Sequence, residues 1–273
     1  MKNSEKIFNA LVREATFTKE VLGAGATQIR NANYSLPGVY AQAFAALSLG
    51  LERIGKLCLM LDFYIENDGK FPDFDYLKNK IGHRLELLQS RSAEIIEKRE
   101  ISFRFLDKID LPVHCAIRKI LHNYAEGDRY SNINLLVGGR QQSDPIAMWY
   151  SSVDMYIFEN LVSGRRKDQI RKNADIINAM MSGNGVIYHT AETGETISSF
   201  ADGSFRAGMF KAVAPYRQLF VLQIIRYWVE LLWELGSMAQ ALGRQEIPFF
   251  GEIFGGFTMK TLFLNQGKYG SFK

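Results

Sequence analysis

The chain has 273 residues, of which 47% are hydrophobic and 23% charged, which places it in the globular range and allows a large buried core. The 33 Lys and Arg residues exceed the 29 Asp and Glu residues by only four, and the charges are dispersed. A balance this mild excludes an inference of nucleic-acid binding from net charge alone, because phosphate binding needs a concentrated basic face.

The cysteines and the N-terminal residues indicate the compartment. Cys58 and Cys115 lie in apolar surroundings without a CxxC pair, which favours buried free thiols in a reducing compartment over a disulfide or a zinc site. Residues 1–20 lack the apolar run of a signal peptide. We therefore expect a cytoplasmic protein of bacterial type.

The first predicted element is a helix over residues 4–30. Apolar residues with helical spacing share one of its faces, and Ser4 is suited to cap it. Gly23-Ala24-Gly25 is expected to interrupt or kink this helix. The segment GAGATQ resembles a phosphate-binding loop only superficially, because no strand precedes it and the Lys-Ser/Thr of a P-loop is absent.

The central feature is a predicted pair of antiparallel helices over residues 35–97. The first helix begins near Ser35 and Pro37 and ends at the turn 66–70, and Asp73 or Asp75 caps the second. Both helices carry apolar stripes with spacings of three and four residues. The predicted buried residues are Phe44, Leu47, Leu51, Ile54, Cys58 and Leu61 in the first helix, and Leu77, Ile81, Leu85, Leu88 and Ile95 in the second.

This pair carries a family resemblance. Leu51-Glu52-Arg53-Ile54-Gly55-Lys56 followed by Ile81-Gly82-His83-Arg84-Leu85-Glu86-Leu87-Leu88 resembles the first helical pair of the HEPN (higher eukaryotes and prokaryotes nucleotide-binding) superfamily. The resemblance implies a helical bundle that often dimerises, in a family with many RNA-cleaving toxins and phage-defence effectors. Their usual signature places four to six residues between an Arg and a His, and none of the four histidines here fits it.

The nearest approach to that signature is Arg118 and His122, with three residues between them. On a helix these two side chains share a face, and a cation beside an imidazole can bind a phosphate and move a proton during attack by a 2′-hydroxyl. We name Arg118 and His122 as candidate catalytic residues of a metal-independent endoribonuclease. The alternative is a surface pair that only covers its helix or contacts acidic neighbours, and enzymatic activity stays open.

A polar stretch over residues 123–134 is predicted to be a loop. Its candidate binding residues are Arg129, Tyr130 and Asn132, where the guanidinium pairs a phosphate or carboxylate and the phenol stacks or hydrogen-bonds. An Arg-Tyr step after an aromatic helix end also occurs in HEPN-like proteins. The alternative is a buried Arg129 that holds loop carbonyl groups.

Two more helices follow. Asp144-Pro145 predicts a helix over 145–162 with a core-facing side at Trp149, Val153, Tyr156, Ile157 and Leu161. The next helix begins with five basic residues in eight, and Arg165, Arg166 and Lys167 are candidate phosphate-binding residues. A solvated helix start is the alternative. We expect its apolar side to be Ile176, Ile177, Met180 and Met181.

The last third of the chain contains the one predicted hairpin and the longest helix. Two β-branched runs around Ala191–Gly194 predict a hairpin over 185–198, in which His189 is a strand surface residue. Residues 206–243 predict a buried core or dimer-interface helix, kinked at Pro215, with a polar stripe at 223, 226, 230 and 234 that argues against a membrane span. The Phe- and Gly-rich tail 246–273 is expected to pack on the body or on a partner.

Taken together, the sequence predicts an all-α helical bundle with one small β-hairpin, in a single domain over residues 1–273, without a metal or cofactor. The leading functional expectation is a homodimeric HEPN-like protein that binds or acts on RNA in bacterial phage defence or stress response. The alternatives are a non-catalytic protein-interaction or dimerisation module, and a helical protein that binds a small ligand. No membrane association is expected.

Overall fold

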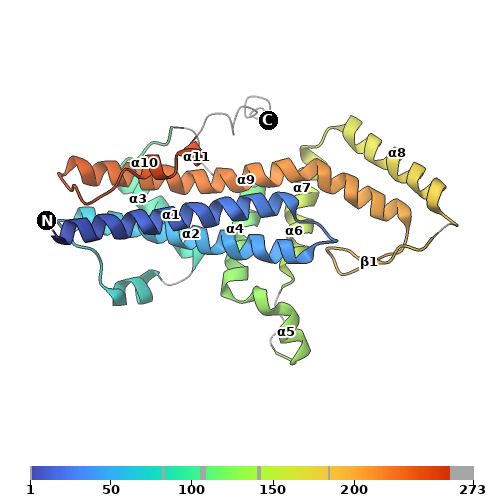
Figure 1. Ribbon diagram of the computed structural model, residues 1–273, viewed down its shortest axis with the longest axis horizontal. Coiled ribbons are helices and arrows are strands. Elements are labelled where there is room, and N and C mark those ends of the chain that lie inside the picture. Colours follow the sequence, from blue (N-terminus) through green and yellow to red (C-terminus); the bar gives the residue numbers. More distant parts are fainter. Residues whose placement is uncertain (1, 82–83, 105–108, 140–142, 184, 259–273) are drawn as a thin grey trace. The chain divides into compact units, whose positions relative to one another are not determined.

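A computed structural model describes residues 2–81, 84–104, 109–139, 143–183 and 185–258 (Figure 1). Helices account for most of these residues, and the only sheet among them has two strands, so the predicted all-α class with a small hairpin is confirmed. In chain order the elements are α1 (Lys2–Asn31), α2 (Pro37–Glu66), the π-helical turn η1 (Tyr76–Ile81), α3 (Leu85–Lys98), α4 (Pro112–Glu126), the 3-10 turn η2 (Asp128–Tyr130), α5 (Ser131–Leu136), α6 (Pro145–Trp149), the π-helical turn η3 (Tyr150–Asp154), α7 (Met155–Asn160), α8 (Gly164–Met181), β1 (His189–Thr190), β2 (Thr196–Ile197), α9 (Phe200–Ala241), α10 (Phe250–Ile253) and α11 (Gly255–Thr258).

The chain divides into two compact units. Unit 1 comprises residues 1–24, 46–110 and 221–273, and unit 2 comprises residues 25–45 and 111–220. The single domain expected from the sequence stays a prediction, and the two units are described separately below.

Unit 1 is built on a close approach of two helices. Leu22 of α1 lies so near Gly50 of α2 that a Cβ on this glycine would come within 2.6 Å of the leucine side chain. The predicted buried stripe is confirmed for Leu51, Ile54, Cys58 and Leu61 of this unit, all at most 5% exposed. Glycine at position 50 therefore sets how tightly α1 and α2 pack in this unit.

The second helix of the predicted pair is divided. The backbone N–H of Tyr76 donates to Asp73 over 2.7 Å, which confirms the predicted cap. However, the helix begins as the π-helical turn η1 and continues as α3, with residues 82–83 of the HEPN-like motif outside the described residues. Leu85, Leu88 and Ile95 are buried as predicted, and Leu77 is half-buried.

The later part of unit 1 is apolar with a buried polar stripe. The predicted core positions from Ile224 to Leu235 are buried, and so are Gln223, Arg226 and Glu230. Arg226 donates to Glu230 over 2.9 Å, and the backbone N–H of Arg104 donates to the other oxygen of Glu230. The described part of the tail packs on this unit: Phe250, Phe254 and Phe257 are buried, while residues 259–273 lie outside the described residues.

One prediction about a break in a helix is wrong. Gly23-Ala24-Gly25 does not interrupt α1, which is continuous to Asn31, so GAGATQ is helical and not a phosphate-binding loop. Gly23 lies near the ring of Phe257, 3.9 Å from where a Cβ would be, which is an ordinary van der Waals separation. The helix α9 runs from Phe200 through Pro215 to Ala241, and the kink expected at Pro215 stays a prediction.

Unit 2 has an aromatic centre. The ring of Phe44 from α2 lies 5.5 Å from that of Tyr124 in α4 and 5.4 Å from that of Trp149 in α6, and all three residues are buried. The Tyr124 hydroxyl also donates to the carbonyl of Ala41 over 3.1 Å. Trp149, Val153 and Ile157 are buried as predicted, although the predicted single helix consists of α6, η3 and α7.

The hairpin lies beside the start of α9 within this unit. His189 pairs with Ile197 and Thr190 with Thr196 in antiparallel register, and Gly194 in the turn has φ +84°. A Cβ on Gly203 of α9 would come within 2.8 Å of Ile187, so this glycine allows the chain entering the hairpin to approach the helix. His189 is exposed, as predicted, with its ring edge-on to Tyr34 at 5.8 Å.

Candidate functional site

The most buried polar group of unit 2 is an ion pair between Arg217 of α9 and Asp154 of η3. Their side chains are 2% and 0% exposed, and Nε of Arg217 donates to Oδ1 of Asp154 over 2.6 Å while Nη2 donates to Oδ2. Trp149 Nε1 also donates to Oδ1 over 3.1 Å. Both carboxylate oxygens thus accept hydrogen bonds from protein groups, as a buried charge requires.

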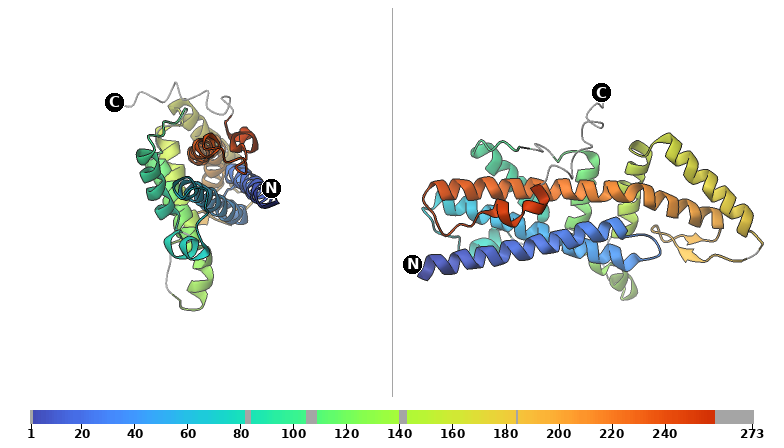
Figure 2. Two further views of the ribbon diagram at one scale, coloured as in Figure 1. Left: turned by 90° about the vertical axis from the view of Figure 1, so that its left-hand side faces the viewer. Right: turned by 45° about the horizontal axis from the view of Figure 1, so that its top comes forward.

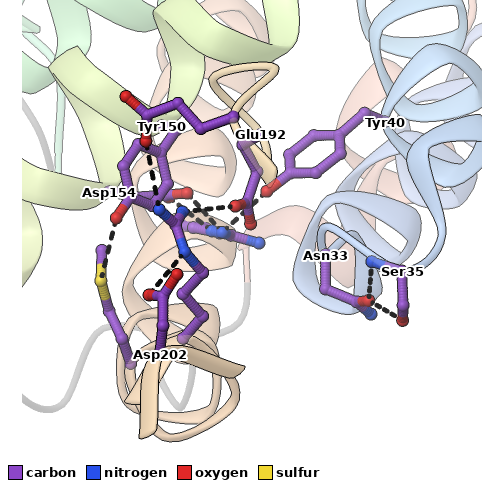
Figure 3. Close-up of polar contacts among 11 residues, drawn as sticks. Asn33, Ser35, Tyr40, Tyr150, Asp154, Glu192 and Asp202 are labelled. Atoms are coloured by element: carbon purple, nitrogen blue, oxygen red, sulfur yellow. Dashed lines mark hydrogen bonds and ion pairs between the residues drawn. The ribbon is translucent and has the colours of Figure 1, made fainter. Parts of the chain in front are cut away.

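The remaining donors of Arg217 reach the segments that precede it in the chain. Nη1 donates to the carbonyl of Ala32 over 2.5 Å, and Nη2 donates to the hydroxyl of Tyr40 over 3.0 Å. Figure 3 shows Tyr40 directing its hydroxyl toward the same cluster as Asp154 and Glu192. One guanidinium therefore joins the end of α1, the start of α2, η3 and α9.

A second arginine connects the hairpin to this cluster. Arg206 of α9 donates to Asp202 over 3.0 Å and to the buried Glu192 over 3.3 Å, and it lies 3.8 Å from the exposed Glu195. Its guanidinium also lies over the ring of Tyr150, 5.3 Å from the centroid. Because Glu192 sits in the hairpin turn, this contact fixes the hairpin on α9.

Burial shifts the titration of several of these groups. Burial, reinforced by repulsion from Glu192, raises the pKa of Asp154 to about 6 against the lowering effect of Arg217. Burial also raises the pKa of Tyr40 and that of Tyr150. At neutral pH the arrangement therefore holds an ionised pair in a desolvated site, and its shielding from solvent indicates a structural role.

The candidate catalytic residues lie on α4. Arg118 and His122 are both half-buried and four residues apart, so they share a helix face as predicted. Nη2 of Arg118 donates to Sγ of Cys115 over 3.5 Å. Cys115 is exposed, contrary to the expectation of two buried thiols, whereas Cys58 is buried as predicted.

The candidate residues after α4 are exposed. The predicted polar loop is instead the short turn η2 followed by α5, and Arg129, Tyr130 and Asn132 all face solvent. The guanidinium of Arg129 lies 5.1 Å from the centroid of the Tyr130 ring. The alternative of a buried Arg129 that holds loop carbonyl groups is therefore wrong.

The basic start of α8 divides between two sides of the helix. Lys167 turns back, donating to the carbonyl of Glu159 over 2.7 Å and lying over Phe158, and Arg171 pairs with Asp168 at 3.2 Å. Arg165, Arg166 and Lys172 are exposed and have no ion-pair partner among the described residues. Of the candidate phosphate-binding residues, Lys167 is thus drawn toward the body and Arg165 and Arg166 face outward.

The free cations belong to one exposed stripe along α8. Helical spacing of three and four residues places polar and apolar side chains on this stripe, and every one of them is exposed. We call it the α8 strip; it consists of Arg165, Arg166, Gln169, Lys172, Asn173, Ile176 and Met180. Of the two carboxylates of α8, Asp168 lies one helical turn from both Arg165 and Lys172 and pairs with Arg171, and Asp175 lies three residues from Lys172, so both border the strip.

The opposite face of α8 is held on α9. Ile170 and Ala174 are buried, and a Cβ on Gly208 would come within 2.8 Å of Ile170 (Figures 1 and 2 show α8 beside the first part of α9). The predicted apolar side is wrong: Ile176, Ile177, Met180 and Met181 are 40–65% exposed. The apolar side of α8 is therefore covered by α9 at Ile170 and Ala174 and exposed to solvent from Ile176 onward.

Neither the family models nor the curated proteins nor the solved structures compared with this chain contain a match. Within the described ranges, no three His, Cys, Asp or Glu residues are grouped so that they could hold a metal ion. None of the described helices is both long and apolar enough to cross a membrane.

The sequence analysis missed the buried ionic cluster. Asp154, Glu192, Arg206 and Arg217 are far apart in the chain, and no motif joins them. The one available signal was a charged residue within a core-facing pattern: Asp154 directly follows the buried Val153 of its helix.

Proposed function

We propose that this chain is a HEPN-like helical protein that binds RNA through the α8 strip, in a bacterial cytoplasm during phage defence or stress. One observation supports the proposal above the others: Arg165, Arg166 and Lys172 are exposed cations on one side of α8, and the carboxylate of Asp168 that borders them is paired with Arg171. Gln169 and Asn173, whose side chains hydrogen-bond to each other over 2.8 Å, lie among them. Arg, Lys and amide side chains are the groups that contact nucleic-acid backbones most often.

The position of these cations adds support. Arg165 and Arg166 occupy the first turn of α8, which contains no acidic residue. Positive charge at a helix N-terminus is unfavourable, by roughly 0.3–1 kcal/mol per charge. Two adjacent exposed arginines there weaken the helix slightly, which is explained if they bind an anion.

The experiment measures binding of a fluorescently labelled RNA by anisotropy at several salt concentrations. The variant with Arg165→Ala and Arg166→Ala removes two strip cations, and the control with Arg13→Ala and Lys70→Ala removes two exposed cations outside α8. We expect the strip variant to lower affinity and to reduce the slope of log K against log salt by about two, and the control to change the slope little. Equal effects of both variants, or no binding by the wild type, would contradict the proposal.

Cleavage is the second part of the proposal, with Arg118 binding a phosphate and His122 moving the proton. The labelled RNA is incubated with wild-type protein in EDTA, since the proposed reaction needs no metal, and alongside Arg118→Ala and His122→Ala. Cleavage by the wild type that both substitutions abolish supports an endoribonuclease. If the RNA stays intact with the wild type, the protein lacks this cleavage activity and only the binding part of the proposal remains.

A second candidate function, a protein-interaction or dimerisation module, is favoured by α5 and the residue after it. Ile133, Leu135, Leu136 and Val137 are 57–85% exposed, more apolar surface than a short solvated helix normally shows. Light scattering during size-exclusion chromatography tests self-association. A dimer that becomes monomeric with Leu136→Asp supports this candidate, and a wild-type monomer rules out dimerisation through α5.

A further inference from the structure

The α8 strip changes in character along its length. It begins with Arg165 and Arg166, continues through Gln169, Lys172 and Asn173, and ends with Ile176 and Met180, which are 56% and 65% exposed. At the helical rise of 1.5 Å per residue, the strip covers about 22 Å from Arg165 to Met180. One partner lying along it meets cations and amides first and apolar side chains last.

The two ends of the strip fit different parts of a nucleic acid. Cations and amides suit phosphates and sugars, which both duplex and single-stranded RNA present. Apolar side chains can pack against the faces of unstacked bases, which a duplex hides in its stack and a single strand exposes. In a duplex, Ile176 and Met180 would face charged backbone or a groove with water and gain little.

We infer that the α8 strip binds single-stranded RNA in preference to duplex, with Arg165, Arg166 and Lys172 on successive phosphates and Ile176 and Met180 against unstacked bases. This inference rests on the proposed RNA binding. The pairing of Asp168 with Arg171 supports it, because that carboxylate borders the strip and would repel the backbone if it were unpaired. The anchoring of α8 by Ile170 against Gly208 keeps the whole strip turned to solvent.

The test uses the full chain with three variants and two probes. The probes are one labelled single-stranded RNA oligonucleotide and the same oligonucleotide annealed to its complement. The apolar variant carries Ile176→Ser and Met180→Ser, and its matched control carries Leu36→Ser and Leu242→Ser, which are similarly exposed apolar residues outside α5 and α8. The third variant is Arg165→Ala with Arg166→Ala. Circular dichroism establishes that each variant keeps its helical content.

We expect the wild type to bind the single strand about tenfold more tightly than the duplex, and the apolar variant to lose about that factor for the single strand alone. Its salt dependence should stay that of the wild type, because no charge changes. The arginine variant should weaken binding of both probes and lower the salt slope. The control with Leu36→Ser and Leu242→Ser should leave both affinities unchanged.

Two results would overturn the inference, and they differ from failure of RNA binding itself. Equal affinity of the wild type for both probes contradicts the preference while leaving RNA binding intact. A single-strand affinity that Ile176→Ser and Met180→Ser leave unchanged contradicts the role of the apolar end. Absence of binding to either probe by the wild type overturns the proposed function, and the inference with it.

Discussion

Nε of Arg217 donates a 2.6 Å hydrogen bond to Oδ1 of Asp154, and the same guanidinium reaches Tyr40 and the carbonyl of Ala32. The two charged residues are 63 positions apart in the chain. Because neither touches solvent appreciably, each is the counter-ion that makes burial of the other tolerable. The first two predictions concern this pair.

Removal of one member should destabilise the protein strongly. Arg217→Met leaves Asp154 buried without its cation, and we expect the free energy of unfolding to fall by about 3–5 kcal/mol in urea denaturation. The double variant with Asp154→Leu and Arg217→Met removes both charges, so its loss should be clearly smaller than that of the single variant. A double variant as unstable as the sum of the two single variants would contradict coupling within the pair.

The same pair should give stability a distinctive pH dependence. The pKa of Asp154 is raised from 3.8 to about 6 in the folded protein, so between these values the folded state binds a proton that the unfolded state does not. The stabilisation that this extra proton gives the folded state is fully present below pH 3.8 and is lost as the pH rises through 6. Titration of Asp154 should therefore increase the free energy of unfolding by up to about 3 kcal/mol on acidification through this window.

The measurement compares wild type with Asp154→Asn by urea denaturation at several pH values from 4 to 7. The asparagine variant lacks the titrating group, so the difference between the two curves isolates Asp154 from other carboxylates. A difference that is constant over this range would contradict the raised pKa.

The packing of α8 on α9 should depend on Gly208. A methyl group there would come within 2.8 Å of Ile170, so Gly208→Ala should cost about 1–3 kcal/mol of unfolding free energy by overpacking. Gly164→Ala is the control, because no atom lies within 4 Å of its added Cβ. The substitution Ile170→Ala in the Gly208→Ala background shortens the neighbouring side chain and should relieve the overlap. If this second substitution lowers the free energy of unfolding further, Ile170 is not the obstructing side chain.

Glu192 should hold the hairpin in place. Glu192→Gln removes the buried charge that Arg206 contacts, while Glu195→Gln removes an exposed charge facing the same arginine. A hairpin with two-residue strands is marginal by itself. Hydrogen exchange at residues 189–197 should therefore accelerate on the order of tenfold in Glu192→Gln, since a buried charged hydrogen bond is worth more than about 1 kcal/mol. Similar exchange in both variants would contradict the special role of the buried carboxylate.

Local sequence was sufficient for the helices, their caps and much of the core. The stripe from Phe44 to Leu61 is buried as its spacing predicts, Asp73 caps the next segment, and the hairpin pairs within its predicted range. These features depend on residues within one or two helical turns, or on a short turn, so periodicity and turn chemistry predict them. The HEPN resemblance, the catalytic pair and the RNA partner stay predictions that rest on the sequence.

Contacts between distant residues decided the rest. Gly23 lies within a continuous helix despite the low helical propensity of glycine, and α8 buries Ile170 and Ala174 while it exposes the later part of its apolar side. The sequence by itself determined which segments are helical and which faces are apolar, since hydrogen bonds and spacing within a helix are local. Only the tertiary structure decided which of those faces are covered and which charges meet in the interior, because burial depends on residues that the chain brings together from far apart.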